Sequence, residues 1–258
     1  MNTTPEPRFS GSARQEPDPH EYEPHELGGQ ELGDPLDWIQ VIERAFLDRL
    51  MDRLVELLGS MESLGDTATD GWPRPVPELV GERLTVLEDQ VRPLTHNSMD
   101  VANVHFASLA VAAYDVLEPV CGGTTAVSIV DECLNKSLRD QILTGTRAML
   151  DAADDPFSTL VATSKERESS FFGPSFRFER PVDDEYSYVL DVPGCLFHEA
   201  LTVLGRPELQ PVLCRFDLNW VDAIDPRRHH LGFARPVTFA TGATCRMVFT
   251  RIEHRPGA

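Results

Sequence analysis

The periodicity of apolar residues changes near residue 165, and this change limits the possible folds more than any other feature. In residues 39–61, apolar positions recur every three or four residues, which predicts an amphipathic helix. In residues 186–192, apolar and polar positions alternate, which is typical of a strand. We therefore expect an α+β fold, in which an N-terminal helical bundle packs on a C-terminal ββααββ unit.

Four helices are expected in the first half of the chain. The first begins at Asp34-Pro35, because Asp is a good N-cap and Pro fits the first helical position. It ends at Gly59 or Gly65. The other three are expected over residues 77–94, from 97 or 98 to 119, and from 124 or 125 to the Asp-Asp-Pro break at 154–156.

The C-terminal part predicts a different order of elements. It contains a strand at 175–179, a turn at 181–184, a strand at 186–192, a helix at 195–204, a helix at 207–220, a turn at 225–228 and two strands within 231–252 that join near Gly242.

Composition divides the chain into three regions. Residues 1–33 are rich in Pro, Glu, Gly and Ser, so we expect a disordered tail whose deletion leaves stability unchanged. Residues 34–160 form the expected helical region. Residues 165–255 form the expected α+β region, which carries every residue of the candidate site.

Charge restricts the partners. The chain has 23 basic and 42 acidic residues, a formal net charge of −19. This argues against nucleic acids and anionic membranes, which both need clustered basic residues. The sequence shows no apolar signal core and no run expected to span a bilayer. We expect a cytoplasmic protein that acts on a small molecule; the oligomeric state stays open.

The five cysteines are expected to be free thiols. Their number is odd, and no CxxC pair occurs, which excludes a zinc ribbon and a thioredoxin-like motif. Cys133 lies on an apolar helical stripe, and Cys121 precedes two glycines, so both are expected to be structural. The other three are Cys195, Cys214 and Cys245.

These three cysteines belong to a longer pattern over roughly residues 170–253. The pattern is Tyr188-x6-Cys195, Cys214-x2-Asp217 and Gly232-Phe233-x-Arg235-x2-Thr238-x3-Gly242-x2-Cys245-x3-Phe249. It resembles the core signature of the L-2-amino-thiazoline-4-carboxylic acid hydrolase family. The resemblance implies a hydrolase that opens a five-membered thiazoline ring at an amidine-like carbon. The family commonly has Asp-Phe after the last cysteine, whereas this chain has Arg246-Met247.

Cys195 is the first candidate nucleophile. It follows a strand and a Pro-Gly turn and begins a helix, where the helix dipole and free N–H groups lower the pKa of a thiol. His198, one helical turn later, could pair with it; the alternative is an exposed helix histidine. Cys195 could also be a buried, unreactive cap.

Cys214, Asp217 and Cys245 are the other candidate catalytic residues. The i, i+3 spacing of Cys214 and Asp217 suits a nucleophile with its general base, or two metal ligands. Otherwise, Cys214 is core and Asp217 caps a turn. Cys245 would be read as strand core if the family signature did not include it.

Arg235, His198 and Tyr188 are expected to bind substrate. Arg235 precedes a proline in an extended segment, and an arginine there can hold a carboxylate through two hydrogen bonds. A surface salt bridge is the alternative. Tyr188 shares a strand face with Tyr186 close to Cys195, although alternating aromatic residues are also typical of core.

Three functions remain open. The first is a cysteine-dependent hydrolase without a cofactor. The second is a lyase or cyclase of a specialised biosynthetic pathway on the same scaffold. The third is a non-catalytic binding protein. A zinc site is a separate alternative, with ligands from Cys195, Cys214, Cys245 and either Asp217 or His198.

Overall fold

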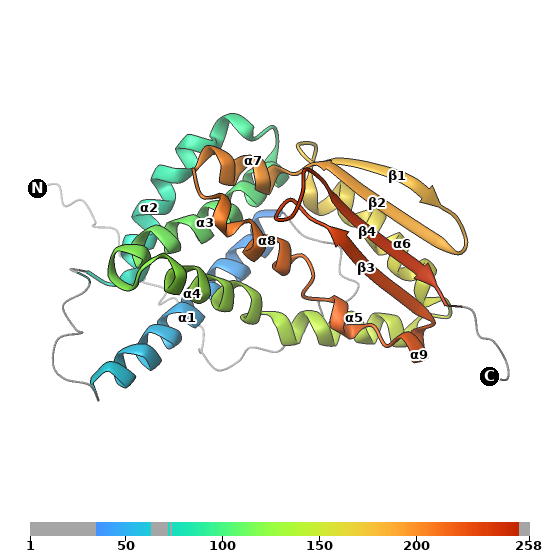
Figure 1. Cartoon of the computed structure of the whole chain (residues 1–258), viewed down its shortest axis with the longest axis horizontal. Helices are drawn as coiled ribbons and strands as arrows, with labels where there is room; N and C mark the ends of the chain where they lie inside the picture. Colours follow the sequence, from blue (N-terminus) through green and yellow to red (C-terminus); the bar gives the residue numbers. More distant parts are fainter. Residues whose placement is uncertain (1–34, 63–71, 73, 253–258) are drawn as a thin grey trace, which may run out of the picture.

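The computed structural model describes residues 35–62, 72 and 74–252. The expected N-terminal tail lies outside these residues. The described elements combine helices with one antiparallel sheet and confirm the α+β class (Figure 1).

Six long helices precede the first strand. They are α1 (Pro35–Glu62), α2 (Val76–Val91), α3 (Ser98–Cys121), α4 (Gly123–Lys136), α5 (Arg139–Ala152) and α6 (Pro156–Arg167). A 3-10 turn η1 (Arg92–Leu94) follows α2, and a π-helical turn η2 (Glu168–Phe172) follows α6.

The C-terminal elements follow the expected ββααββ order, with the short helix α9 added before the third strand. They are β1 (Arg177–Asp183), β2 (Ser187–Gly194), α7 (Leu196–Val203), η3 (Pro207–Leu209), α8 (Gln210–Phe216), η4 (Val221–Ala223), α9 (Pro226–His229), β3 (Leu231–Val237) and β4 (Cys245–Arg251). The sheet order is β1-β2-β4-β3, so the last strand lies in the middle. Tyr188 stands opposite Phe249, and Val192 stands opposite Cys245.

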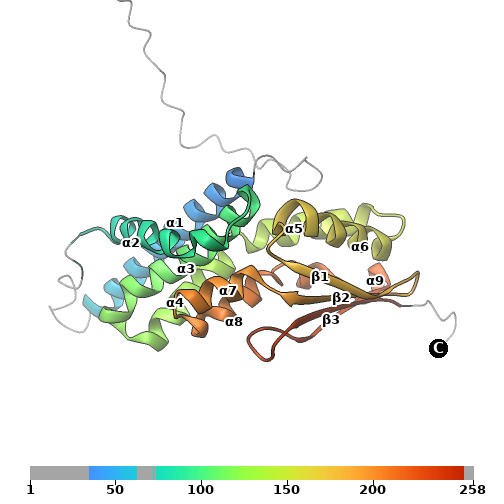
Figure 2. The ribbon, with the colours of Figure 1, turned by 90° about the horizontal axis from the view of Figure 1, so that it is seen from above.

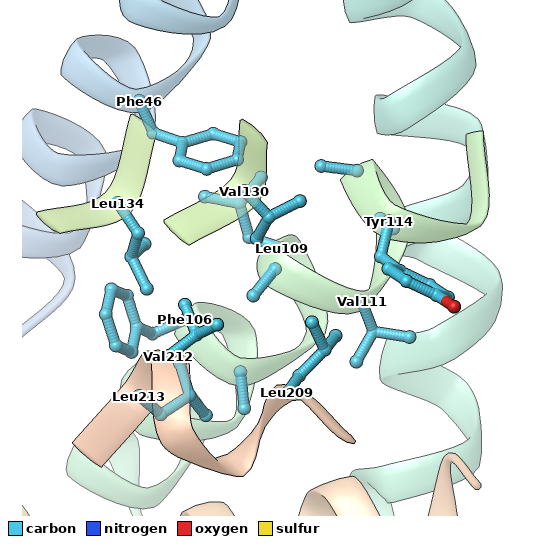
Figure 3. Close-up of a cluster of buried hydrophobic side chains, with 14 of the residues drawn as sticks. Phe46, Phe106, Leu109, Val111, Tyr114, Val130, Leu134, Leu209, Val212 and Leu213 are labelled. Atoms are coloured by element: carbon cyan, nitrogen blue, oxygen red, sulfur yellow. The ribbon is translucent and has the colours of Figure 1, made fainter. Parts of the chain in front are cut away.

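Two hydrophobic clusters hold the fold together. The first, here called the bundle core, contains side chains from α1 to α4 and from α7 and α8. Figure 3 shows Val212 and Leu213 beside Phe106 of α3, and Leu209 near Val111 of the same helix, in this cluster. The second, here called the sheet core, contains residues of α5, α6, β2, β3 and β4.

The two cores do not follow chain order. Helices α7 and α8 lie between strands in the sequence but pack on the bundle, where α7 contacts α3 and α8 contacts α4. Helices α5 and α6 leave the bundle and lie along one face of the sheet (Figure 2). The chain therefore passes from the bundle core to the sheet core, returns to the bundle core at α7 and α8, and ends in the sheet core.

The third helix extends beyond its expected end. It continues through Pro119 to Cys121, where Gly122 takes a positive φ of 80° and ends it. A proline removes only one backbone donor, and the Gly122 N–H still closes the last turn on the Glu118 carbonyl. The prediction of a stop at Glu118-Pro119 was wrong for this reason.

The expected fourth helix is two helices, α4 and α5, which break at Ser137-Leu138. The Ser137 hydroxyl donates to the Cys133 carbonyl one turn earlier, an interaction that bends helices. The break allows α5 to leave the bundle and reach the sheet.

Helix α6 was not predicted, although its start signal is present. The Asp155 side chain accepts a hydrogen bond from the Ser158 N–H, and Pro156 occupies the first helical position. Strand β1 also extends further than expected, because the turn lies at Asp184, whose carboxylate accepts from Tyr186 and Ser187 N–H groups.

Two C-terminal helices also differ from the prediction. Helix α8 ends at Phe216, four residues before the expected Trp220. The expected turn at 225–228 contains the short helix α9, because Asp225 caps the N–H groups of Arg227 and Arg228.

Helix α3 corrects the expectation that no apolar run is long enough to span a bilayer. Within the described residues it is the one helix long and apolar enough to cross a membrane. It contacts α1, α2, α4 and α7, and most of its side chains are buried in the bundle core. A mostly buried helix of this composition is consistent with a soluble protein.

Candidate functional site

Five residues of the sequence pattern meet where the two cores adjoin. Cys195 is the N-cap of α7, and Cys214 lies in the last turn of α8, with Asp217 directly after that helix. Arg235 lies in β3, and Cys245 is the first residue of β4. Residues separated by up to 50 positions in the chain thus form one cluster, here called the thiol cluster.

Arg235 lies at the centre of the thiol cluster, with a side chain only 8% exposed. Its Nε donates to the Cys245 Sγ at 3.2 Å, and its Nη1 donates to the Cys214 carbonyl oxygen at 2.8 Å. Its Nη2 lies 3.2 Å from Asp217 Oδ2. Each nitrogen of the guanidinium therefore already has a protein partner, and of its five N–H donors one on Nη1 and one on Nη2 are left.

The Cys195 thiol departs from the expected acidity. Burial raises its pKa to about 12, and the N–H groups of His198 and Phe197, which face the sulfur, offset only part of this effect. The helix N-terminus thus acts as predicted, but loss of hydration outweighs it. The expectation of a lowered pKa was wrong, because burial favours the neutral form of the Cys195 thiol.

The Cys245 thiol is subject to two opposing effects. Burial raises its pKa, while the charge and hydrogen bond of Arg235 lower it, and burial prevails. The cluster therefore combines two thiols whose pKa burial raises with an internal Arg–Asp ion pair.

The Gln210 side chain links His198 to Cys214. The Gln210 Nε2 donates to the Cys214 Sγ at 3.3 Å, and the Gln210 Oε1 lies 3.0 Å from the His198 Nδ1. Since an amide oxygen only accepts, the His198 Nδ1 carries the hydrogen. The His198 ring stacks on Phe239. Sequence reasoning missed Gln210, although it stands one helical turn before Cys214.

Tyr188 is fully buried in the sheet core. Its hydroxyl donates to Glu168 Oε1 at 2.7 Å, and its ring contacts Phe249. It lies four residues along β2 from Val192, the partner of Cys245, a separation of about 13 Å. Through Glu168, the first residue of η2, these contacts of Tyr188 stabilise that turn.

Arg167 also belongs to the site, and sequence reasoning missed it with α6. Its Nη2 lies 3.9 Å from Asp217 Oδ1, so the Asp217 carboxylate stands between Arg167 and Arg235. The Asp-Pro start of α6 was the signal that could have placed Arg167 at the end of a helix.

The zinc alternative does not fit the arrangement of these side chains. Across residues 35–62, 72 and 74–252, no group of three or more His, Cys, Asp or Glu side chains is placed to hold a metal ion. A dication among the thiols would also face the guanidinium of Arg235, which contacts Cys245 and Asp217.

The two remaining cysteines lie away from the thiol cluster. Cys133 is fully buried in the bundle core, where burial raises its pKa to about 12. Cys121 is half-buried, and its Sγ contacts the Leu117 carbonyl one turn earlier. Both positions agree with a structural role.

Comparison with known families gives a match for this chain. The sequence model of the L-2-amino-thiazoline-4-carboxylic acid hydrolase family matches residues 102–249, more than half of the chain and all of the thiol cluster. Neither the curated proteins nor the solved structures give a match.

Proposed function

Because the chain belongs to the L-2-amino-thiazoline-4-carboxylic acid hydrolase family, we propose that it is a cysteine-dependent hydrolase of small cyclic C–N or C–S substrates such as a thiazoline carboxylate. The observation that carries the proposal is the thiol cluster itself. Three cysteines from α7, α8 and β4 share one site with Asp217 and Arg235. Thiols beside a carboxylate and two guanidinium groups offer a nucleophile and a proton acceptor.

Cys195 is the proposed nucleophile. Its neutral thiol suits a basic substrate, since the ring nitrogen of an amidine can accept the thiol proton while the sulfur attacks the adjacent carbon. The new C–S bond forms as the C=N bond becomes single. Negative charge that develops on the Cys195 sulfur is stabilised by the Phe197 and His198 N–H groups.

Ring opening and hydrolysis follow. The ring C–S bond breaks, the substrate sulfur leaves as a thiol with a proton from the amidine, and the carbon stays on Cys195. Water attacks this carbon and passes a proton to Asp217, which acts as general base. The Cys195 sulfur is then expelled and regains that proton. One water is consumed, and the product carries a ureido group and a free thiol.

The reaction is tested with L-2-amino-thiazoline-4-carboxylate in water labelled with heavy oxygen, with products read by mass spectrometry. We expect one heavy oxygen in each product molecule, together with a new thiol. Turnover without label would indicate a lyase or cyclase and contradict the proposal. Binding without turnover would indicate a non-catalytic binding protein and contradict it equally.

A further inference from the structure

A carboxylate on the substrate needs a local cation, because the chain as a whole carries a net charge of −19. Arg235 is less suited, since its side chain is 8% exposed and three of its five N–H donors already contact Cys245, the Cys214 carbonyl and Asp217. Arg167 is the other guanidinium beside Asp217.

The guanidinium of Arg167 is held but has available donors. Its central carbon lies 5.0 Å from the ring centre of Phe171 and 5.6 Å from that of Phe172. Its side chain is 34% exposed, and the 3.9 Å distance to Asp217 exceeds a hydrogen bond. Within the described part of the chain, no hydrogen bond of this guanidinium is present. A stacked guanidinium keeps its N–H groups free at its edge for a bidentate contact.

The π turn η2 explains why both rings reach Arg167. A π turn pairs residue i with residue i+5, which brings Phe172 over Arg167 beside Phe171. Such turns are rare and often occur at functional sites. The arrangement therefore depends on keeping η2 intact.

Two buried side chains anchor η2. Asn103 Nδ2 donates to the carbonyl oxygens of Phe171 at 2.8 Å and Phe172 at 3.2 Å. At the other end, Glu168 is 7% exposed and accepts from Tyr188 and Arg180. These contacts fix the turn before any ligand arrives, so the position of Arg167 is preorganised.

We infer that Arg167 binds the carboxylate of the substrate and selects amidine-like rings that carry one. This inference rests on the proposed function for the identity of the ring. A ligand held in this way directs its anionic end to Arg167 and its uncharged amidine toward the thiol cluster. The site thus fits a small ring that carries a carboxylate, with Arg235 left to organise the cysteines.

The test is a binding measurement by calorimetry on the full chain, with Cys195→Ser added to every protein, the wild type included, so that no probe is hydrolysed during the titration. The two probes are L-2-amino-thiazoline-4-carboxylate and 2-amino-thiazoline, the same ring without the carboxylate. We expect the wild type to bind the carboxylate probe at least tenfold more tightly. Arg167→Gln should remove this preference, and Arg167→Lys should keep part of it. Arg74→Gln, which removes an exposed arginine paired with Glu82, is the matched control and should keep it fully.

The contrary results are equally specific. A preference that survives Arg167→Gln, or that disappears in Arg235→Lys alone, would overturn the inference and assign binding of the carboxylate to Arg235. A wild type that shows no preference, or binds neither probe, would also overturn it. If the preference follows Arg167 but no labelled product forms, the proposed hydrolysis fails while the inference stands.

Discussion

The bundle core and the sheet core bury the same kinds of side chain, but a cysteine thiol has different neighbours in each. Cys133 is enclosed by the bundle core, whereas Cys245 lies in the sheet core within reach of Arg235. Cys195 packs against both cores at their boundary. Burial raises the pKa of all three, so burial alone does not distinguish a structural cysteine from a candidate nucleophile. Among these three thiols, the distinguishing feature is a hydrogen-bond donor to the sulfur, which is Arg235 for Cys245 and the Phe197 and His198 N–H groups for Cys195.

The largest expected effect comes from removing a ring from each core. Phe46→Ala in the bundle core and Phe249→Ala in the sheet core should each lower the free energy of unfolding by about 3–5 kcal/mol, since both rings are buried. Only Phe249→Ala should also lower turnover per folded molecule, because β4 positions Cys245. Urea unfolding and activity measure both effects. Normal turnover in Phe249→Ala would contradict the expected difference between the two cores.

The second prediction concerns pH and the bundle. Burial alone lowers the pKa of His105, but contacts with Glu43 and Glu88 outweigh it and raise the pKa to about 9. Because the folded-state pKa lies above the unfolded value of 6.5, this stabilisation is complete below pH 6.5. It is lost as pH rises from 6.5 to 9, by on the order of 2 kcal/mol after solvent screening.

The measurement for His105 is unfolding free energy across that pH range, with His105→Gln as the comparison. Glutamine can still hydrogen-bond but does not titrate, so the slope should flatten in the variant. An unchanged slope in His105→Gln would assign the pH dependence to other groups.

A smaller effect is expected where the sheet core meets η2. Tyr188→Phe removes the hydroxyl that donates to buried Glu168 and should cost about 1–2 kcal/mol. It should also weaken binding of the carboxylate probe severalfold, because η2 loses one anchor for Arg167. Thermal unfolding and calorimetry measure the two effects. Loss of stability with unaltered affinity would show that η2 does not position Arg167.

Local sequence signals predicted much of the fold. Periodicity located β2, β4 and the first three helices, and the cysteine pattern selected residues that the structure brings together. These features depend on local spacing, which a single chain displays directly. The start of α6 at Asp155-Pro156 was equally local, and recognising it would have revealed Arg167.

Other features depend on packing between distant segments. The Arg235 contacts join β3 to α8 and β4, and the π turn depends on Asn103, some 68 residues away. The N–H groups at the start of α7 lower the pKa of Cys195, as the sequence predicts, but burial raises it by more. Burial depends on how the two cores assemble, which local sequence does not display. Such effects become visible only when the neighbours are known.

The central claim is that catalysis belongs to the boundary thiols and not to buried thiols in general. The direct test measures turnover and melting temperature of Cys195→Ser, Cys214→Ser, Cys245→Ser and Cys133→Ser side by side. Cys195→Ser should fold and show no turnover, since serine caps a helix but is a poor nucleophile at neutral pH. Cys133→Ser should lose about 1–3 kcal/mol of stability, because it buries a hydroxyl, yet keep its turnover per folded molecule. Activity in all three boundary variants would contradict the account, and a dead Cys214→Ser or Cys245→Ser beside an active Cys195→Ser would move the nucleophile to that residue.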